Sequence, residues 1–263
     1  MNNGKLLTFG IQHLLAMYTG AILVPLIIGG ALGMTPEQIT YLIAIDLFMC
    51  GVATLLQVWK GKFFGIGLPV VLGCTFTAVT PIISIGIEFG ISAIYGAIIA
   101  SGLIIILMSG FFGKIVKFFP PIVTGSVVTI IGISLLSTAL NNVAGGQGSP
   151  TFGAKENIIL AAITLVVIIV VYRFTKGFMR AIAILLGMIA GTVAGLLMGV
   201  TNFDVVADAG IFHMVQPFYF GAPEFLLEPI LVMTLIGMVS LVESTGVYYA
   251  LSDITKTKID SKE

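Results

Sequence analysis

Apolar residues occupy this chain in long blocks that are separated by short polar connections. About 20 apolar residues cross the hydrocarbon core of a bilayer as a helix, so the pattern predicts an all-α polytopic membrane protein. The first block exceeds the apolar core of a signal peptide and counts as a span. Eight spans are expected, at residues 8–30, 38–58, 66–84, 91–112, 119–140, 157–174, 181–200 and 227–250.

The third predicted span is irregular in composition. Between residues 65 and 76 it contains Gly65, Gly67, Pro69 and Gly73, which is poor material for a continuous helix. Backbone groups released from a helix cannot face lipid, so they must line a cavity or meet other protein. Broken helices at membrane depth are typical of transporter binding sites. We expect a broken third span, the alternative being a kinked helix packed through small residues.

Composition and charge support a membrane environment. The chain of 263 residues is 58% hydrophobic and 9% charged, against roughly 25% charged residues in soluble domains. Its net charge is zero and it lacks a dense basic block, which argues against a nucleic-acid partner. The two cysteines, Cys50 and Cys74, lie in apolar segments, so neither a disulfide framework nor a metal-ligand cluster is supported.

The basic residues predict the orientation of the chain in the membrane. With the N-terminus in the cytoplasm, Lys155 is the only one of the 12 lysines and arginines that lies outside. This asymmetry agrees with the positive-inside rule, which the reverse orientation would violate. An even number of spans returns the C-terminus to the cytoplasm. We therefore expect a multi-pass protein of the cell membrane with both termini cytoplasmic.

The carboxylate of Glu243 stands out within the last apolar block. A charged group at the centre of a membrane helix costs about 2.5 to 3.5 kcal/mol on insertion scales, so it normally faces a cavity or the protein interior. It could carry a proton in a coupled carrier, or act as a structural partner of a neighbouring helix. Ser244, Thr245 and Gly246 follow it and predict a point where the helix could end or break.

Two further ionisable residues, His13 and Asp46, lie inside predicted spans. Either could handle protons, although a buried histidine such as His13 more often satisfies a structural hydrogen bond, and Asp46 could equally tether two helices. The sequence contains no glycine-rich phosphate loop, no His/Cys metal spacing and no nucleophilic serine elbow. We therefore expect no enzyme, cofactor or metal, and favour a secondary carrier driven by an ion gradient.

Four motifs in order give the chain a resemblance to the nucleobase/ascorbate transporter family, the xanthine/uracil permeases. They are Gln12–Met17 with Leu23–Leu26, Asp46–Phe48 with Gly51–Gln57, Gly65–Pro69, and Leu241–Gly246. The similarity covers essentially the whole chain. Uracil-type members have a histidine one helical turn after the carboxylate, whereas this chain has Val247. The resemblance is therefore closest to bacterial xanthine or uric acid permeases.

This resemblance implies a fold of two inverted repeats of seven spans, divided into a core domain and a gate domain. Residues 1–112 would form core spans one to four, and 113–200 gate spans five to seven. Residues 201–223 would form an external connection, and 224–263 core span eight with a cytoplasmic tail. Since the family has fourteen spans and this chain has eight predicted ones, we expect a truncated product that does not transport alone.

The resemblance also implies a function and a site. Members are typically proton symporters for nucleobases, and homodimers are expected. Glu243 would bind the base and Phe76 would pack on it, because a flat, amide-like base suits a carboxylate and an aromatic face. By position, Thr75 and Gly20 would lie close to the pocket, with His13 and Asp46 supporting it or coupling protons.

The expected substrate is a purine, xanthine or uric acid, carried with a proton rather than with sodium. Three alternatives stay open: a carrier of uracil or another nucleobase, an anion carrier of the sulfate type with the same fold, and a non-transporting membrane subunit. A carboxylate at the substrate counts against the anion carrier, whose site would favour a cation or a helix N-terminus.

Overall fold

The chain folds entirely into helices and connections over the described residues. A computed structural model describes residues 3–59, 61, 65–111, 121–146, 149–201, 203 and 216–256. The helices are α1 (Asn3–Ala31), α2 (Pro36–Val58), the 3₁₀ turn η1 (Phe76–Ala78), α3 (Val79–Phe89), α4 (Ile91–Ser109), α6 (Pro121–Val143), α7 (Lys155–Phe174), α8 (Phe178–Ala181), α9 (Ala183–Leu197) and α11 (Leu227–Thr255). The prediction of an all-α membrane protein is confirmed over these residues.

Five helices among the described residues are long and apolar enough to cross a membrane. They lie in α1, α2, α4, α7 and α11. The predicted seventh span, residues 181–200, is shorter in the structure, because α9 has only 15 residues and the chain turns just past its end at Gly199 (φ 70°). A separate short turn, α8, precedes α9. The predicted limits of two other spans also change, since α3 runs on to Phe89 and α11 to Thr255.

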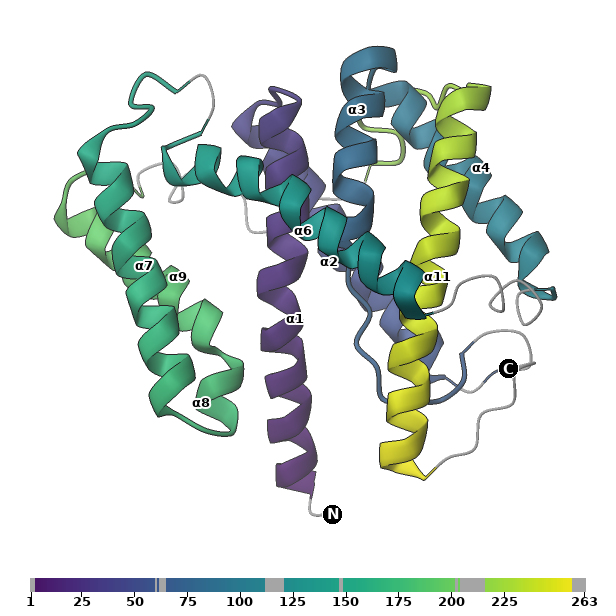
Figure 1. Ribbon diagram of the computed structural model, residues 1–263, viewed down its shortest axis with the longest axis horizontal. Coiled ribbons are helices and arrows are strands. Elements are labelled where there is room, and N and C mark those ends of the chain that lie inside the picture. Colours follow the sequence, from purple (N-terminus) through teal and green to yellow (C-terminus); the bar gives the residue numbers. More distant parts are fainter. Residues whose placement is uncertain are drawn as a thin grey trace.

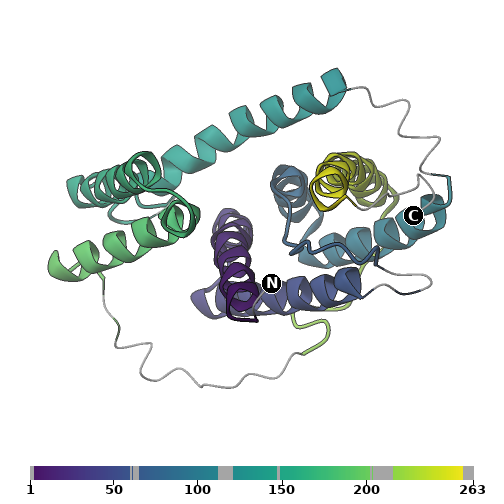
Figure 2. The same cartoon turned by 90° about the horizontal axis from the view of Figure 1, so that it is seen from below.

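The helices form two groups that lie side by side. Helices α1, α2, α3, α4 and α11 make up one group, and α7, α8 and α9 pack together beside α1. Helix α6 runs obliquely across the face of the molecule and contacts both groups (Figures 1 and 2). The start of α1 and the end of α11 lie at the same end of the molecule (Figure 1).

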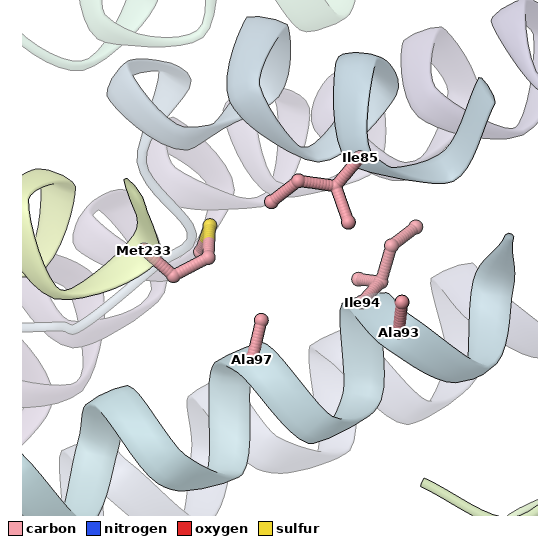
Figure 3. Packing of buried hydrophobic residues seen from close by; sticks show 5 residues of the cluster. All are labelled: Ile85, Ala93, Ile94, Ala97 and Met233. Atoms are coloured by element: carbon pink, nitrogen blue, oxygen red, sulfur yellow. The ribbon is translucent and has the colours of Figure 1, made fainter. Parts of the chain in front are cut away.

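Small side chains allow close packing in the first group. Ala93 and Ala97 of α4 are completely buried and face Ile85 of α3 and Met233 of α11 (Figure 3). Lipid is as apolar as these side chains, so helices in a membrane associate through close van der Waals contact rather than through the hydrophobic effect. The alanines permit that contact and hold α11 against α4.

A stripe of glycines has the same role in the second group. Gly187, Gly191 and Gly195 recur every four residues on α9 and face α7. A Cβ atom on Gly187 or Gly191 would meet the side chain of Ile168 or Thr164. The stripe therefore sets the short separation of α7 and α9.

The described part of the external connection folds back onto the ends of α2 and α4. The Tyr41 hydroxyl donates to the carbonyl of Gln216 (2.7 Å) and accepts from its N–H (2.8 Å). The Tyr41 ring stacks on Tyr219 with centroids 4.1 Å apart. The Glu224 N–H donates to the carbonyl of Ser92 (2.9 Å). Residues 216–226 are thus part of the packed structure.

We predict that Gly96→Ala destabilises the protein by about 1 to 3 kcal/mol, because a Cβ atom there would meet the Glu224 carbonyl where the connection crosses α4. Gly102→Ala is the matched control on the same helix, since nothing lies within 4 Å of its Cβ position and alanine favours the helix. Detergent-denaturation curves of the purified chain measure both. Equal stability of the two variants would contradict the close approach.

Candidate functional site

The predicted break in the third span is present. Residues 65–75 are not helical, and Gly65 and Gly67 adopt φ angles of 73° and 71°. A Cβ atom on Gly65 would meet the carbonyl oxygens of Leu56 and Trp59, and the Gly67 N–H donates to the carbonyl of Gln57 (3.2 Å). Glycine is therefore required for the chain to turn closely around the end of α2.

The extended segment after this turn bonds to α1 and α2. The Leu72 N–H donates to the Thr54 hydroxyl (2.9 Å), which itself donates to the Cys50 carbonyl (2.7 Å). The Cys74 thiol donates to the Ala21 carbonyl of α1, with 3.5 Å between the sulfur and the oxygen. These contacts satisfy backbone and thiol groups that lipid could not. They fix where the chain re-enters a helix.

Thr75 begins the helical part of the broken span. Its hydroxyl accepts a hydrogen bond from the Thr77 N–H (3.2 Å) and so caps η1. Phe76 is the first residue of η1, and its side chain packs against the buried cluster of Val24, Ile28 and Val79. The predicted aromatic residue therefore contacts α1 and α3 at the break.

Glu243 of α11 faces this same turn. The Thr77 hydroxyl donates to Glu243 Oε2 (3.0 Å), and the Thr75 hydroxyl donates to the Thr77 hydroxyl (3.0 Å). Thr77, the central residue of this chain of hydrogen bonds, is only 6% exposed, whereas Thr75 and Glu243 are half-buried. The structure thus joins two predicted site residues, Thr75 and Glu243, through a third that the sequence did not single out.

Helix α11 continues past Glu243, so the predicted break at Ser244–Gly246 is wrong. The hydroxyls of Ser244 and Thr245 donate to the carbonyls of Ser240 and Leu241, both at 2.8 Å. These side chains bond within their own helix and leave its backbone ladder in place. The helix ends only after Thr255, where Lys256 adopts the left-handed conformation.

A cavity of about 210 Å³ lies next to η1. Asp46 of α2 and Thr75 line it together with the aromatic side chains of Tyr95 and Phe220. Glu243 is not among its lining residues. The cavity is below the range of roughly 300 to 1,000 Å³ typical of sites for drug-sized ligands. Thr75 is therefore the residue shared by the cavity and the hydrogen-bonded chain.

The remaining predicted site residues, Asp46, Gly20 and His13, differ in how they relate to the cavity and to the hydrogen-bonded chain. Asp46 accepts a weak hydrogen bond from the Cys50 thiol (3.8 Å) and faces the cavity. Gly20 lies one helical turn before Val24, which also lines the cavity. His13 is exposed on α1 and takes no part in the contacts that join Thr75, Thr77 and Glu243. The structure does not bring His13 into the site.

The sequence interpretation missed Thr77 and Phe220. Thr77 lies two residues after the break and could have been considered because of that position alone. Phe220 belongs to the external connection, and no sequence signal placed its ring in a cavity between helices. No group of three or more His, Cys, Asp or Glu side chains in the described ranges is arranged to hold a metal ion.

The fold and site are those of a helical membrane protein with a broken span and an intramembrane carboxylate. The model of the permease family, Xan_ur_permease, matches residues 4–263, and the chain belongs to this family of nucleobase/ascorbate transporters. It is therefore a member of a transporter family and not of an enzyme family.

Relatives of the chain include xanthine, uric acid and uracil permeases. The chain is 61% identical to a xanthine permease of Bacillus subtilis, over 97% of this chain and 58% of that protein. It is 60% identical to the uric acid permease PucK of the same organism, over 98% of this chain and 60% of that protein. It is 32% identical to the B. subtilis uracil permease, over 94% of this chain and 56% of that protein. The chain thus spans a little over half the length of these relatives.

We predict that Thr54→Val destabilises the protein by about 1 to 3 kcal/mol, because it leaves the half-buried Leu72 N–H without its acceptor. Thr54→Ser keeps the hydroxyl and should remain close to the wild type. Thr40→Val is the control on the same helix, since that exposed hydroxyl bonds only to the Pro36 carbonyl of its own helix. Detergent-denaturation curves compare the three, and an unchanged Thr54→Val would show that the segment is held by other contacts.

Proposed function

We propose that this chain forms part of a carrier that takes up oxidised purines of the xanthine and uric acid type across the cell membrane, and that Glu243 binds the base. The observation that carries the proposal is the chain of hydrogen bonds from the broken span to Glu243. Transporters commonly place their substrate beside broken helices at membrane depth. The identities of 61% and 60% to a xanthine and a uric acid permease of Bacillus subtilis, against 32% to the uracil permease of the same organism, support a purine.

The chemistry of a purine base suits these groups. A carboxylate accepts hydrogen bonds from ring N–H groups, and charge-assisted bonds of this kind are roughly twice as strong as neutral ones. Phe76, the residue before Thr77, supplies an aromatic ring in the same turn, and Thr75 supplies a hydroxyl. A carboxylate at the substrate disfavours the anion carrier of the same fold, since it would repel an anion.

We further propose that transport is coupled to protons. Glu243 is the group best placed to carry the proton, because it lies within a membrane-spanning helix and has a hydrogen-bonded hydroxyl beside it. Asp46, which faces the cavity from α2, is the second candidate. The exposed position of His13 gives it no support as a proton carrier.

The orientation with both termini in the cytoplasm is part of the proposal. Its support is that α1 starts, and α11 ends, at one end of the molecule, where α8 also lies (Figure 1). Arg173, Lys176 and Arg180 surround α8 at that end, whereas Lys155 begins α7 at the other. This distribution fits the positive-inside rule.

The division into core and gate domains is also a proposal. The two groups of helices support it, since α1 to α4 and α11 correspond to the expected core and α7 to α9 to the expected gate. The seven-plus-seven inverted repeat and the homodimer rest on the family resemblance and stay predictions.

We predict that the chain, purified and reconstituted in lipid nanodiscs, binds radiolabelled uric acid, and that xanthine competes better than uracil. Glu243→Gln should weaken binding roughly 10- to 100-fold, because a charge-assisted hydrogen bond is worth about 1.5 to 3 kcal/mol. Glu228→Gln, in the first turn of the same helix, is the control and should bind like the wild type.

The outcomes separate the candidate functions. Binding that is insensitive to Glu243→Gln would contradict the assigned site. A folded chain that binds no nucleobase would contradict the purine site in this chain and would favour a non-transporting membrane subunit.

A further inference from the structure

Thr77 differs from the other buried polar side chains of the described residues. The buried polar side chains there are Thr77, Ser101 and Thr234. The hydroxyls of Ser101 and Thr234 donate to carbonyls in their own helices, at 3.1 and 2.7 Å. The Thr77 hydroxyl instead donates to a side chain 166 positions away in the sequence. Its hydrogen bond is thus a tertiary contact between η1 and α11.

The donors and acceptors around Thr77 fix the direction of this bond. A hydroxyl has one proton to donate. The Thr77 oxygen accepts the proton of Thr75 and the Thr77 proton points to Glu243, while the Thr77 N–H bonds back to the Thr75 hydroxyl. The two threonines therefore hold each other in one arrangement. In that arrangement Thr77 acts only as a donor toward the carboxylate.

This arrangement constrains the carboxylate of Glu243. A glutamate side chain has three rotatable bonds and loses considerable rotamer freedom when it is fixed. Thr77 occupies one lone pair of Oε2, and the described residues supply no other hydrogen-bond donor to this carboxylate. Oε1 is left to accept a hydrogen bond from a ligand.

We infer that Thr77 is a positioning residue for Glu243, which orients one carboxylate oxygen so that the other can accept a ring N–H of the purine. The inference rests on the proposed function of Glu243. It assigns to Thr77 an action through the carboxylate and not a contact with the base. It also explains the buried hydroxyl at a position where valine would have the same shape.

Binding of radiolabelled uric acid to nanodisc-reconstituted variants tests the inference. Thr77→Val keeps the shape of the side chain and removes the donor, so affinity should fall roughly tenfold or more. Thr77→Ser keeps the hydroxyl and should stay within about threefold of the wild type. Thr234→Val is the matched control, since it removes a buried threonine hydroxyl whose bond stays within α11. If Thr77→Val does not fold, Thr77→Ala takes its place.

An infrared measurement tests the same contact without a ligand. Difference spectra between acidic and neutral pH identify the carboxyl band that Glu243→Gln removes. This band should shift in Thr77→Val, because the carboxylate loses a hydrogen-bond donor, and should stay in place in Thr77→Ser and Thr234→Val. If Thr77 only linked η1 to α11, Thr77→Val would lower the stability of the protein but would not shift the carboxyl band.

The two measurements separate the inference from the proposed function. A shifted band in a chain that binds no purine would support the positioning role and contradict the purine site. An unshifted band in Thr77→Val would overturn the positioning role. So would a Thr77→Ser variant that loses affinity as fully as Thr77→Val, since packing rather than the hydroxyl would then be responsible.

Discussion

The arrangement of this protein depends on how the non-helical residues 65–75 satisfy their backbone inside the membrane. Each N–H or C=O group without a partner in hydrocarbon costs several kcal/mol, so such a segment must bond to protein. Here the partners are the Thr54 hydroxyl and the Gln57 carbonyl, both of α2. They fix the path of the segment between α1 and α2, and so the position at which η1 begins.

The location of η1 in turn determines the surroundings of Glu243. An ionisable group in the membrane costs about 2.5 to 3.5 kcal/mol, and a hydrogen bond to a charged group returns about 1.5 to 3. The bond from Thr77 is therefore of the right size to offset much of that cost. The broken span and the carboxylate support one another, because neither would have this partner in a continuous third helix.

The external connection contributes to the same region from the opposite side. Phe220 reaches the cavity that Asp46 and Thr75 also line, and Tyr41 holds the neighbouring backbone at Gln216. The cavity is thus lined by residues from α1, α2, the broken third span, α4 and the external connection. The composition of this connection indicates only a polar and aromatic loop, but its Phe220 forms part of the cavity wall.

The sequence by itself determined the membrane class, most spans, the break in the third span and the presence of the Glu243 carboxylate within the last span. These follow from local properties: the length of apolar blocks, the backbone preferences of glycine and proline, and the cost of a charge in lipid. Only the tertiary structure decided that Thr77 bonds Glu243, that His13 lies outside the site, and that α11 continues past Gly246. The first two outcomes depend on which groups meet across the fold, and the third on whether a hydroxyl bonds within its own helix. Neither can be predicted from local composition.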